Sequence, residues 1–175
     1  MRKLYAVLVA AAIVGVSVMA FTFSAVAGDR DRDRDEMEFK ARLTGFQETP
    51  AISTTGSGTF KAQLSEDGTS LSFTLTYSGL EADALFAHIH LGQKGVAGGV
   101  SAFLCGGGGK PACPARSGTV TGTITASDVI GPTGQGIAAG QFAELIRAMR
   151  AGVTYANVHS TVFGGGEIRG QITED

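Results

Sequence analysis

The most regular pattern in the chain is Phe60-Lys61-Ala62-Gln63-Leu64-Ser65-Glu66-Asp67-Gly68-Thr69-Ser70-Leu71-Ser72-Phe73-Thr74-Leu75-Thr76-Tyr77. Apolar side chains occupy every second position on both sides of Glu66-Asp67-Gly68. This period of two is typical of β-strands that bury one face, and a glycine-containing turn between two such strands predicts a hairpin.

The same alternation continues outward in both directions. Phe39, Ala41 and Leu43 mark a strand before the hairpin, and further strands are expected over 84–91, 99–104, 119–125, 154–162 and 167–173. One helix interrupts them, because Phe142, Leu145, Ile146 and Met149 fall at helical spacing. We therefore predict an all-β fold, an antiparallel, Greek-key-like β-sandwich of about eight strands with one short helix.

Composition limits the function classes. The chain has 175 residues, of which 43% are hydrophobic, as expected for one globular domain. The formal net charge of −2 leaves no basic surplus to bind phosphates, so we expect no nucleic-acid partner.

The amino-terminal residues are typical of a secretory leader. Arg2 and Lys3 precede an apolar run, and Ala25-Val26-Ala27 offers small residues for a signal peptidase. We expect a signal peptide over 1–27 cleaved after Ala27, a charged disordered linker over 28–37 and one domain over 38–175; an uncleaved anchor is the alternative. The mature chain would then lack a membrane span and be secreted or periplasmic.

Two cysteines flank a glycine-rich segment. Cys105 and Cys113 enclose Gly106-Gly107-Gly108-Gly109-Lys110-Pro111-Ala112. Because the predicted compartment is oxidising, we expect them to form a disulfide. A redox role is the minor alternative, since the spacing is not Cys-x-x-Cys.

Three histidines are candidate metal ligands. His88 and His90 share one face of a predicted strand while Ala87, Ile89 and Leu91 take the other, and His159 lies on the polar face of a later strand. Neutral imidazoles suit copper or zinc, so a three-histidine site is chemically reasonable. The alternative is three histidines on neighbouring strands without a ligand.

Four polar residues could support these histidines. Glu167 and Arg169 project from one face of the last strand, and Gln47 and Glu48 precede a Thr-Pro step. A carboxylate behind an imidazole fixes its tautomer, and an arginine could guide an anion. The alternatives are an exposed strand face with a local Glu–Arg pair, and an ordinary polar turn.

Four motifs in order resemble the CHRD (chordin) domain family: Gly45-Phe46-Gln47-Glu48-Thr49-Pro50, Ala87-His88-Ile89-His90-Leu91-Gly92, Tyr155-Ala156-Asn157-Val158-His159-Ser160 and Gly166-Glu167-Ile168-Arg169-Gly170-Gln171-Ile172. The resemblance spans about 39–172 and implies a secreted domain. A weaker resemblance links the chain to copper/zinc superoxide dismutases. It implies that His88, His90 and His159 would bind copper and that Arg169 would guide an anionic substrate, without the further histidines of a zinc site.

Three functions follow in order of preference. The first is a secreted CHRD-domain module that binds a metal, copper before zinc, through His88, His90 and His159. The second is an extracellular protein-interaction or structural module without a metal, whose protein partner is unknown. The third is superoxide dismutase-like activity. We expect a binding module rather than an enzyme, and assign no catalytic residue.

Overall fold

Residues 37–175, the part of the chain that the computed structural model describes, contain nine strands, one α-helix and three short 3-10 helices. In chain order they are β1 (Glu38–Thr44), η1 (Gly45–Gln47), β2 (Ser57–Leu64), β3 (Ser70–Ser78), β4 (Ala84–Leu91), β5 (Gly99–Cys105), β6 (Gly118–Thr125), η2 (Ala126–Asp128), η3 (Thr133–Gln135), α1 (Phe142–Arg150), β7 (Thr154–Ser160), β8 (Ile168–Gln171) and β9 (Thr173–Glu174). The all-β class with one short helix is confirmed. The proposed signal peptide and all of the proposed linker except Met37 lie outside the described residues.

The hairpin predicted from residues 60–77 forms as β2 and β3. Its pairing runs without a break from Ser57 opposite Ser78 to Leu64 opposite Leu71. Gly68 in the turn has a φ of 70°, a left-handed conformation that glycine adopts without steric cost. Side chains along β3 alternate between buried and exposed, so the period of two corresponds to one core-facing side.

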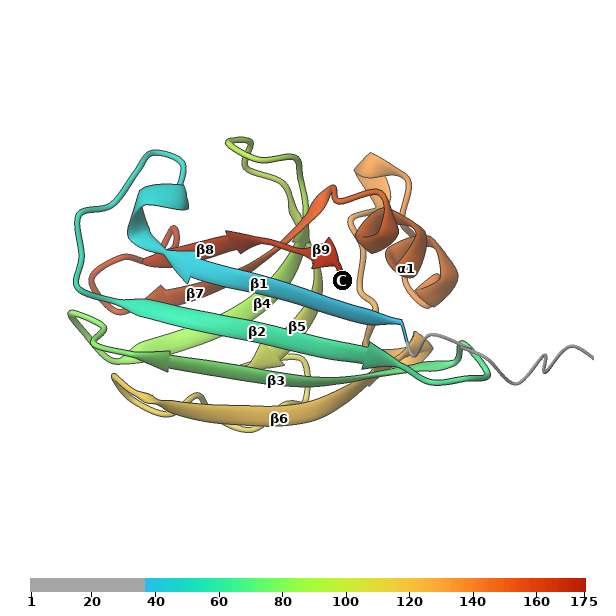
Figure 1. Ribbon diagram of the computed structural model, residues 1–175, viewed down its shortest axis with the longest axis horizontal. Coiled ribbons are helices and arrows are strands. Elements are labelled where there is room, and N and C mark those ends of the chain that lie inside the picture. The colour runs from blue at the N-terminus through green and yellow to red at the C-terminus, as the bar shows by residue number, and fades with distance from the viewer. Residues whose placement is uncertain (1–36) are drawn as a thin grey trace, which may run out of the picture. The chain divides into compact units, whose positions relative to one another are not determined.

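All nine strands belong to one antiparallel sheet that folds over into two layers. The strand order is β5-β4-β7-β8-β1-β2-β3-β6, with β9 paired to β1. Figure 1 shows β1, β2, β3 and β6 in one layer and β4, β5, β7 and β8 in the other. The core lies between the layers and includes the fully buried Phe60, Leu75, Ile89 and Ile168.

The sheet is nearly closed. The layers are joined on one side where Thr44 of β1 pairs with Arg169 of β8. On the other side β5 and β6 are the ends of the order, and a single bridge joins Ala102 to Val129 just after η2. The connections from β3 to β4 and from β6 to β7 join strands that are not neighbours in this order, in agreement with the Greek-key-like prediction.

The predicted helix lies at one end of the two layers (Figure 1). It buries Phe142, Leu145, Ile146 and Met149, the four residues whose spacing predicted it. Gly152 follows the helix with a φ of 66° and donates its N–H to the Met149 carbonyl, which ends the helix in a left-handed turn.

The last predicted strand, over 167–173, is two strands in the structure. β8 pairs with β7 and touches β1 at one position, whereas β9 pairs with β1 alone. Between them Ile172 is fully buried and donates its N–H to the Thr154 carbonyl. The break therefore lies where the chain passes from one layer to the other.

The predicted disulfide between Cys105 and Cys113 is present, with the two Cα atoms 5.1 Å apart. The glycines that it encloses lie against a ring: a Cβ atom on Gly107 would come within 2.4 Å of the Phe103 side chain. Only a residue without a side chain allows this approach. The loop thus covers Phe103.

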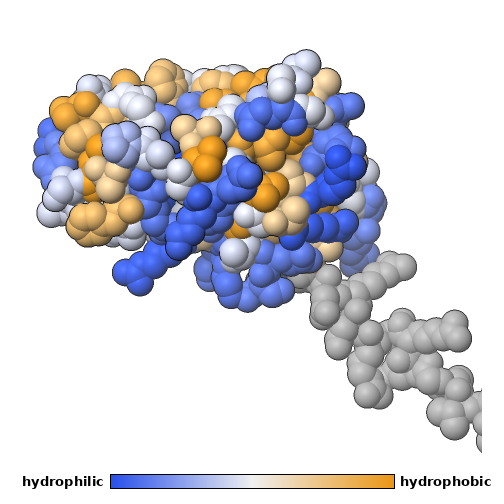
Figure 2. All heavy atoms as spheres, turned by 90° about the horizontal axis from the view of Figure 1, so that it is seen from above, coloured by the Kyte–Doolittle hydropathy of each residue, from blue (hydrophilic) through white to orange (hydrophobic). Residues whose placement is uncertain are grey.

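The outer surface mixes apolar and hydrophilic residues, as the view from above shows (Figure 2). The large exposed apolar side chains are Phe46, Leu85, Phe86, Val96, Ile130 and Val162. Of the helices in residues 37–175, none has the length and apolar character that crossing a bilayer requires.

Candidate metal centre

The three histidines come together because β4 and β7 are neighbours. In their pairing, His88 lies opposite Asn157 and Phe86 opposite His159, so His88 and His159 are diagonal neighbours on one face. On the other face Ala87 and Ile89 are fully buried in the core. The apolar residues between the histidines therefore determine which way the imidazoles point.

One nitrogen from each imidazole contributes to a compact cluster. The candidate ligand atoms of His88, His90 and His159 all lie within 4.8 Å of one another. His88 Nδ1 and His159 Nε2 lie 3.1 Å apart. Two nitrogens that both bind one ion at about 2 Å have roughly this separation. The predicted convergence of the three imidazoles is thus observed.

Backbone carbonyls determine the tautomers of two histidines. The Nδ1 atom of His90 lies 2.9 Å from the Gly98 carbonyl, and that of His159 lies 3.0 Å from the Gly164 carbonyl. A carbonyl only accepts, so both Nδ1 atoms carry hydrogen and both Nε2 atoms keep a lone pair. A backbone partner behind the imidazole is the usual support of a metal-binding histidine.

The tautomer of His88 follows from that of His159. Because His159 Nε2 is an acceptor, His88 Nδ1 donates to it in the metal-free chain. His88 Nε2 is then left buried without a hydrogen-bond partner, as is His90 Nε2. Buried polar atoms without partners are unusual in proteins, so the lone pair of His90 Nε2 indicates a place for an ion or water. His88 would instead bind an ion through Nδ1, once its proton has moved to Nε2.

Burial keeps all three imidazoles neutral. They are only 6–7% exposed. Desolvation, followed by the neighbouring His159 and His90, lowers the pKa of His88 from 6.5 to about 3. Desolvation is also the main cause that lowers the pKa of His90 to about 4, and it lowers the pKa of His159. Neutral imidazole is the form that binds a metal.

Aromatic rings surround the cluster, and we call Phe86, Phe103 and Tyr155 the aromatic wall. Phe103 meets the His88 ring edge-on at a centroid distance of 4.4 Å, and Phe86 stacks on it at 5.8 Å. Tyr155 stacks on His90 with centroids 4.7 Å apart and planes 6° apart. The sequence pattern did not identify Phe103, because only the register of β4 and β5 brings it opposite His88. Phe86 was missed although it stands two residues before His88 on the same strand.

Arg169 is placed behind the aromatic wall. Its guanidinium carbon lies 3.4 Å from the centre of the Tyr155 ring, a cation–π contact. It also donates to the carbonyls of Gln93 and Val96, both at 2.9 Å. The residue is 2% exposed. This geometry favours a role in holding the segment between β4 and β5 over guidance of an anion.

The family model of the CHRD domain matches residues 39–172. The chain belongs to the CHRD domain family. The comparisons with curated proteins and with solved structures found no match. The matched residues contain all three histidines, so the candidate centre lies within the CHRD domain itself.

Glu48 is connected to the candidate metal centre of this CHRD domain through one residue, Asn157. Its carboxylate accepts a hydrogen bond of 2.6 Å from Asn157 Nδ2, and Asn157 lies opposite His88. Burial raises the pKa of Glu48 from 4.5 to about 7, against the opposing effects of Asn157 and Arg169. Glu48 therefore helps to place Asn157 beside the cluster, without touching an imidazole in any hydrogen bond seen in residues 37–175.

Glu167 and Gln47 are placed differently. Glu167 is fully buried, and its Oε1 atom accepts hydrogen bonds from the Thr54 hydroxyl and the Glu81 N–H, each at 2.7 Å. Gln47 donates to the Arg42 carbonyl at 2.8 Å. Neither hydrogen-bonds a histidine within the described chain. The alternative of an exposed face for Glu167 and Arg169 is wrong, because loops cover this face and leave them 0% and 2% exposed.

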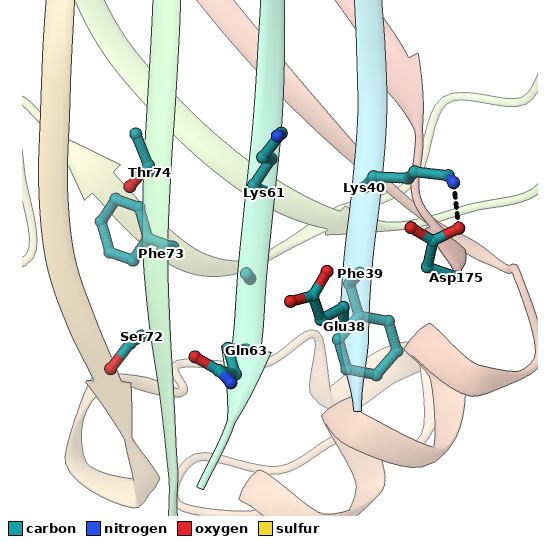
Figure 3. A pocket seen from close by; sticks show the side chains of 10 residues that line it. Glu38, Phe39, Lys40, Lys61, Gln63, Ser72, Phe73, Thr74 and Asp175 are labelled. Atoms are coloured by element: carbon teal, nitrogen blue, oxygen red, sulfur yellow. Dashed lines mark hydrogen bonds and ion pairs between the residues drawn. The ribbon is translucent and has the colours of Figure 1, made fainter. Parts of the chain in front are cut away.

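A separate hollow of about 510 Å³ lies on the outer face of β1, β2 and β3 in the CHRD domain. Figure 3 shows its polar lining, including Lys61, Gln63 and Thr74, and the ion pair between Lys40 and Asp175. These are side chains that a sheet presents to water, and no histidine lines the hollow. The histidine cluster is therefore the stronger candidate site.

Proposed function

We propose that the chain is a secreted CHRD-domain module that binds copper through His88, His90 and His159. The observation that carries the proposal is the convergence of the three buried imidazole nitrogens within 4.8 Å of one another. The backbone hydrogen bonds of His90 and His159 support it further, since they hold a lone pair toward the cluster. Zinc is the alternative metal, because imidazole also suits zinc.

The chemistry of the centre favours binding. The hydrogen bonds of the imidazoles seen in the described residues go to one another and to the backbone carbonyls of Gly98 and Gly164. The proposed roles of the four polar residues are supportive: Arg169 through Tyr155, Glu48 through Asn157, and Glu167 and Gln47 by holding nearby loops. Secretion is supported by the disulfide, which suits an oxidising compartment.

The test is metal stoichiometry on purified protein. The chain is incubated with copper, in one series with a reductant and in one without, and passed through a desalting column before elemental analysis. We expect one copper per chain, and less than a tenth of that for His88→Ala. Lys61→Ala, in the separate hollow that no histidine lines, is the control outside the cluster and should keep the wild-type stoichiometry. Retention of copper by His88→Ala, or no copper on the wild type, would contradict the proposal.

A further inference from the structure

The charge of the candidate centre differs from that of most divalent-metal sites. All three donors are neutral imidazoles, and no carboxylate of residues 37–175 belongs to the cluster. Glu48 is hydrogen-bonded to Asn157, and Glu167 to Thr54 and Glu81. Nothing in the cluster therefore neutralises the charge of a bound ion.

Arg169 places a positive charge close to the cluster. Arg169 contacts the same Tyr155 ring that stacks on His90. A divalent ion would feel twice the repulsion of a monovalent ion.

Burial of the cluster also disfavours a divalent ion relative to a monovalent one. The imidazoles are 6–7% exposed, and the aromatic wall separates His88 and His90 from water. The cost of transferring an ion from water to an apolar interior grows with the square of its charge, so it is about four times larger for a divalent ion.

The number of donors points the same way. Zinc in proteins binds four ligands, and copper(II) prefers a tetragonal arrangement of four or more. Copper(I) is stable with two or three. The cluster offers three nitrogens, and the rings of Phe86 and Phe103, which carry no donor atom, lie against His88.

We infer that the three-histidine centre is selective for the oxidation state of copper and binds copper(I) more tightly than copper(II). This inference rests on the proposed copper-binding function and adds to it the ion that the centre holds. Its bound copper resists oxidation, because oxidation would leave a second uncompensated charge behind the aromatic wall.

The experiment compares dissociation constants for the two oxidation states. Copper(I) is titrated without oxygen against a chromophoric copper(I) chelator, and copper(II) against an amino-acid chelator. We expect copper(I) to bind at least 100-fold more tightly, which corresponds to a reduction potential about 120 mV above that of aqueous copper, at 59 mV per tenfold for one electron. Equal or tighter binding of copper(II) would overturn the inference and leave the proposed function intact. Absence of binding in both states would instead overturn the proposed function.

A charge variant tests the cause. Phe86 is 39% exposed and stacks on His88, so the surface tolerates a polar residue there. Phe86→Glu adds a carboxylate beside the cluster, and its preference for copper(I) should be at least tenfold smaller than that of Phe86→Gln, which has the shape of glutamate without the charge. The same preference in both variants would overturn the electrostatic explanation, and circular dichroism spectra check that both fold.

Discussion

His88 Nδ1 and His159 Nε2 lie 3.1 Å apart, although 71 residues separate them in the chain. In the metal-free chain a hydrogen atom stands between these nitrogens, since His159 Nδ1 already donates to Gly164. A metal ion that binds both must replace this hydrogen bond, and His88 then carries its proton on Nε2. The cluster is thus ready to exchange an internal hydrogen bond for an ion without taking up or losing a proton.

The buried histidines make the metal-free protein sensitive to acid. His88 and His90, with pKa values of about 3 and 4, stay neutral in the folded state, whereas unfolding restores the ordinary value of 6.5. Unfolding therefore takes up protons between about pH 6.5 and 4, so stability falls as pH falls through this window. His88→Asn should reduce the slope of unfolding free energy against pH by about 1.2 kcal/mol per pH unit near pH 5.5, which urea unfolding measures. Parallel slopes for variant and wild type would contradict this.

The contribution of Glu48 to stability should depend on pH in the opposite direction. Its pKa of about 7 in the folded state exceeds its ordinary value of 4.5, so the contribution of the protonated form is present below 4.5 and is lost as pH rises through 7. Glu48→Gln keeps an acceptor for Asn157 and never ionises. We expect it to raise the free energy of unfolding by about 1–3 kcal/mol at pH 8 and to change it little at pH 4. If the variant and the wild type differed in unfolding free energy by the same amount at pH 4 and pH 8, ionisation of Glu48 would not be the cause of the difference.

Gly166 supplies a test of the packing around Glu48. Its φ is 131°, and a Cβ atom there would lie 2.7 Å from both Asn157 Nδ2 and Glu48 Oε1. Gly166→Ala should therefore destabilise the fold by about 2 kcal/mol or more. The neighbouring Gly165 has open space around it, so Gly165→Ala is the matched control and should cost less than about 0.5 kcal/mol. Equal Tm values for the two variants in a thermal melt would refute this account.

The disulfide should contribute measurably to stability. It closes a short loop, Cys105 and Cys113 being 8 positions apart, and loop-closure entropy for such a loop is about 2–3 kcal/mol. The double variant Cys105→Ala, Cys113→Ala should lose about this much in urea unfolding, and reduction of the wild type should give the same loss. A loss under about 1 kcal/mol would mean that glycine packing on Phe103 holds the loop without the bond.

Much of this architecture follows from local pattern. The alternation of Leu71, Phe73, Leu75 and Tyr77 predicts strand β3 and its buried side, because a pleated strand has a period of two. The helix follows from the spacing of its four apolar residues in the same way. The ends of strands were predicted less accurately. The break at Ile172 arises because the chain changes its pairing partner there, which no local pattern indicates.

The candidate site was predictable in its ligands and less so in its surroundings. The apolar residues that flank His88, His90 and His159 determine the face, so the convergence of the imidazoles could be expected. The burial of that face could not, because it depends on loops that cross it. Arg169 and Glu167 were expected on a polar row and instead lie beneath these loops, hydrogen-bonded to backbone groups.

Gly98 connects the centre to the segment that covers it. Its carbonyl accepts from His90, its N–H donates to the Tyr155 hydroxyl at 3.1 Å, and Arg169 holds the same segment at Gln93 and Val96. Release of an ion through this side requires these bonds to break together, as one local unfolding event. An ion that left through this side would have a residence time limited by the opening rate of residues 92–98, and hydrogen exchange at the Gly98 amide would measure that opening.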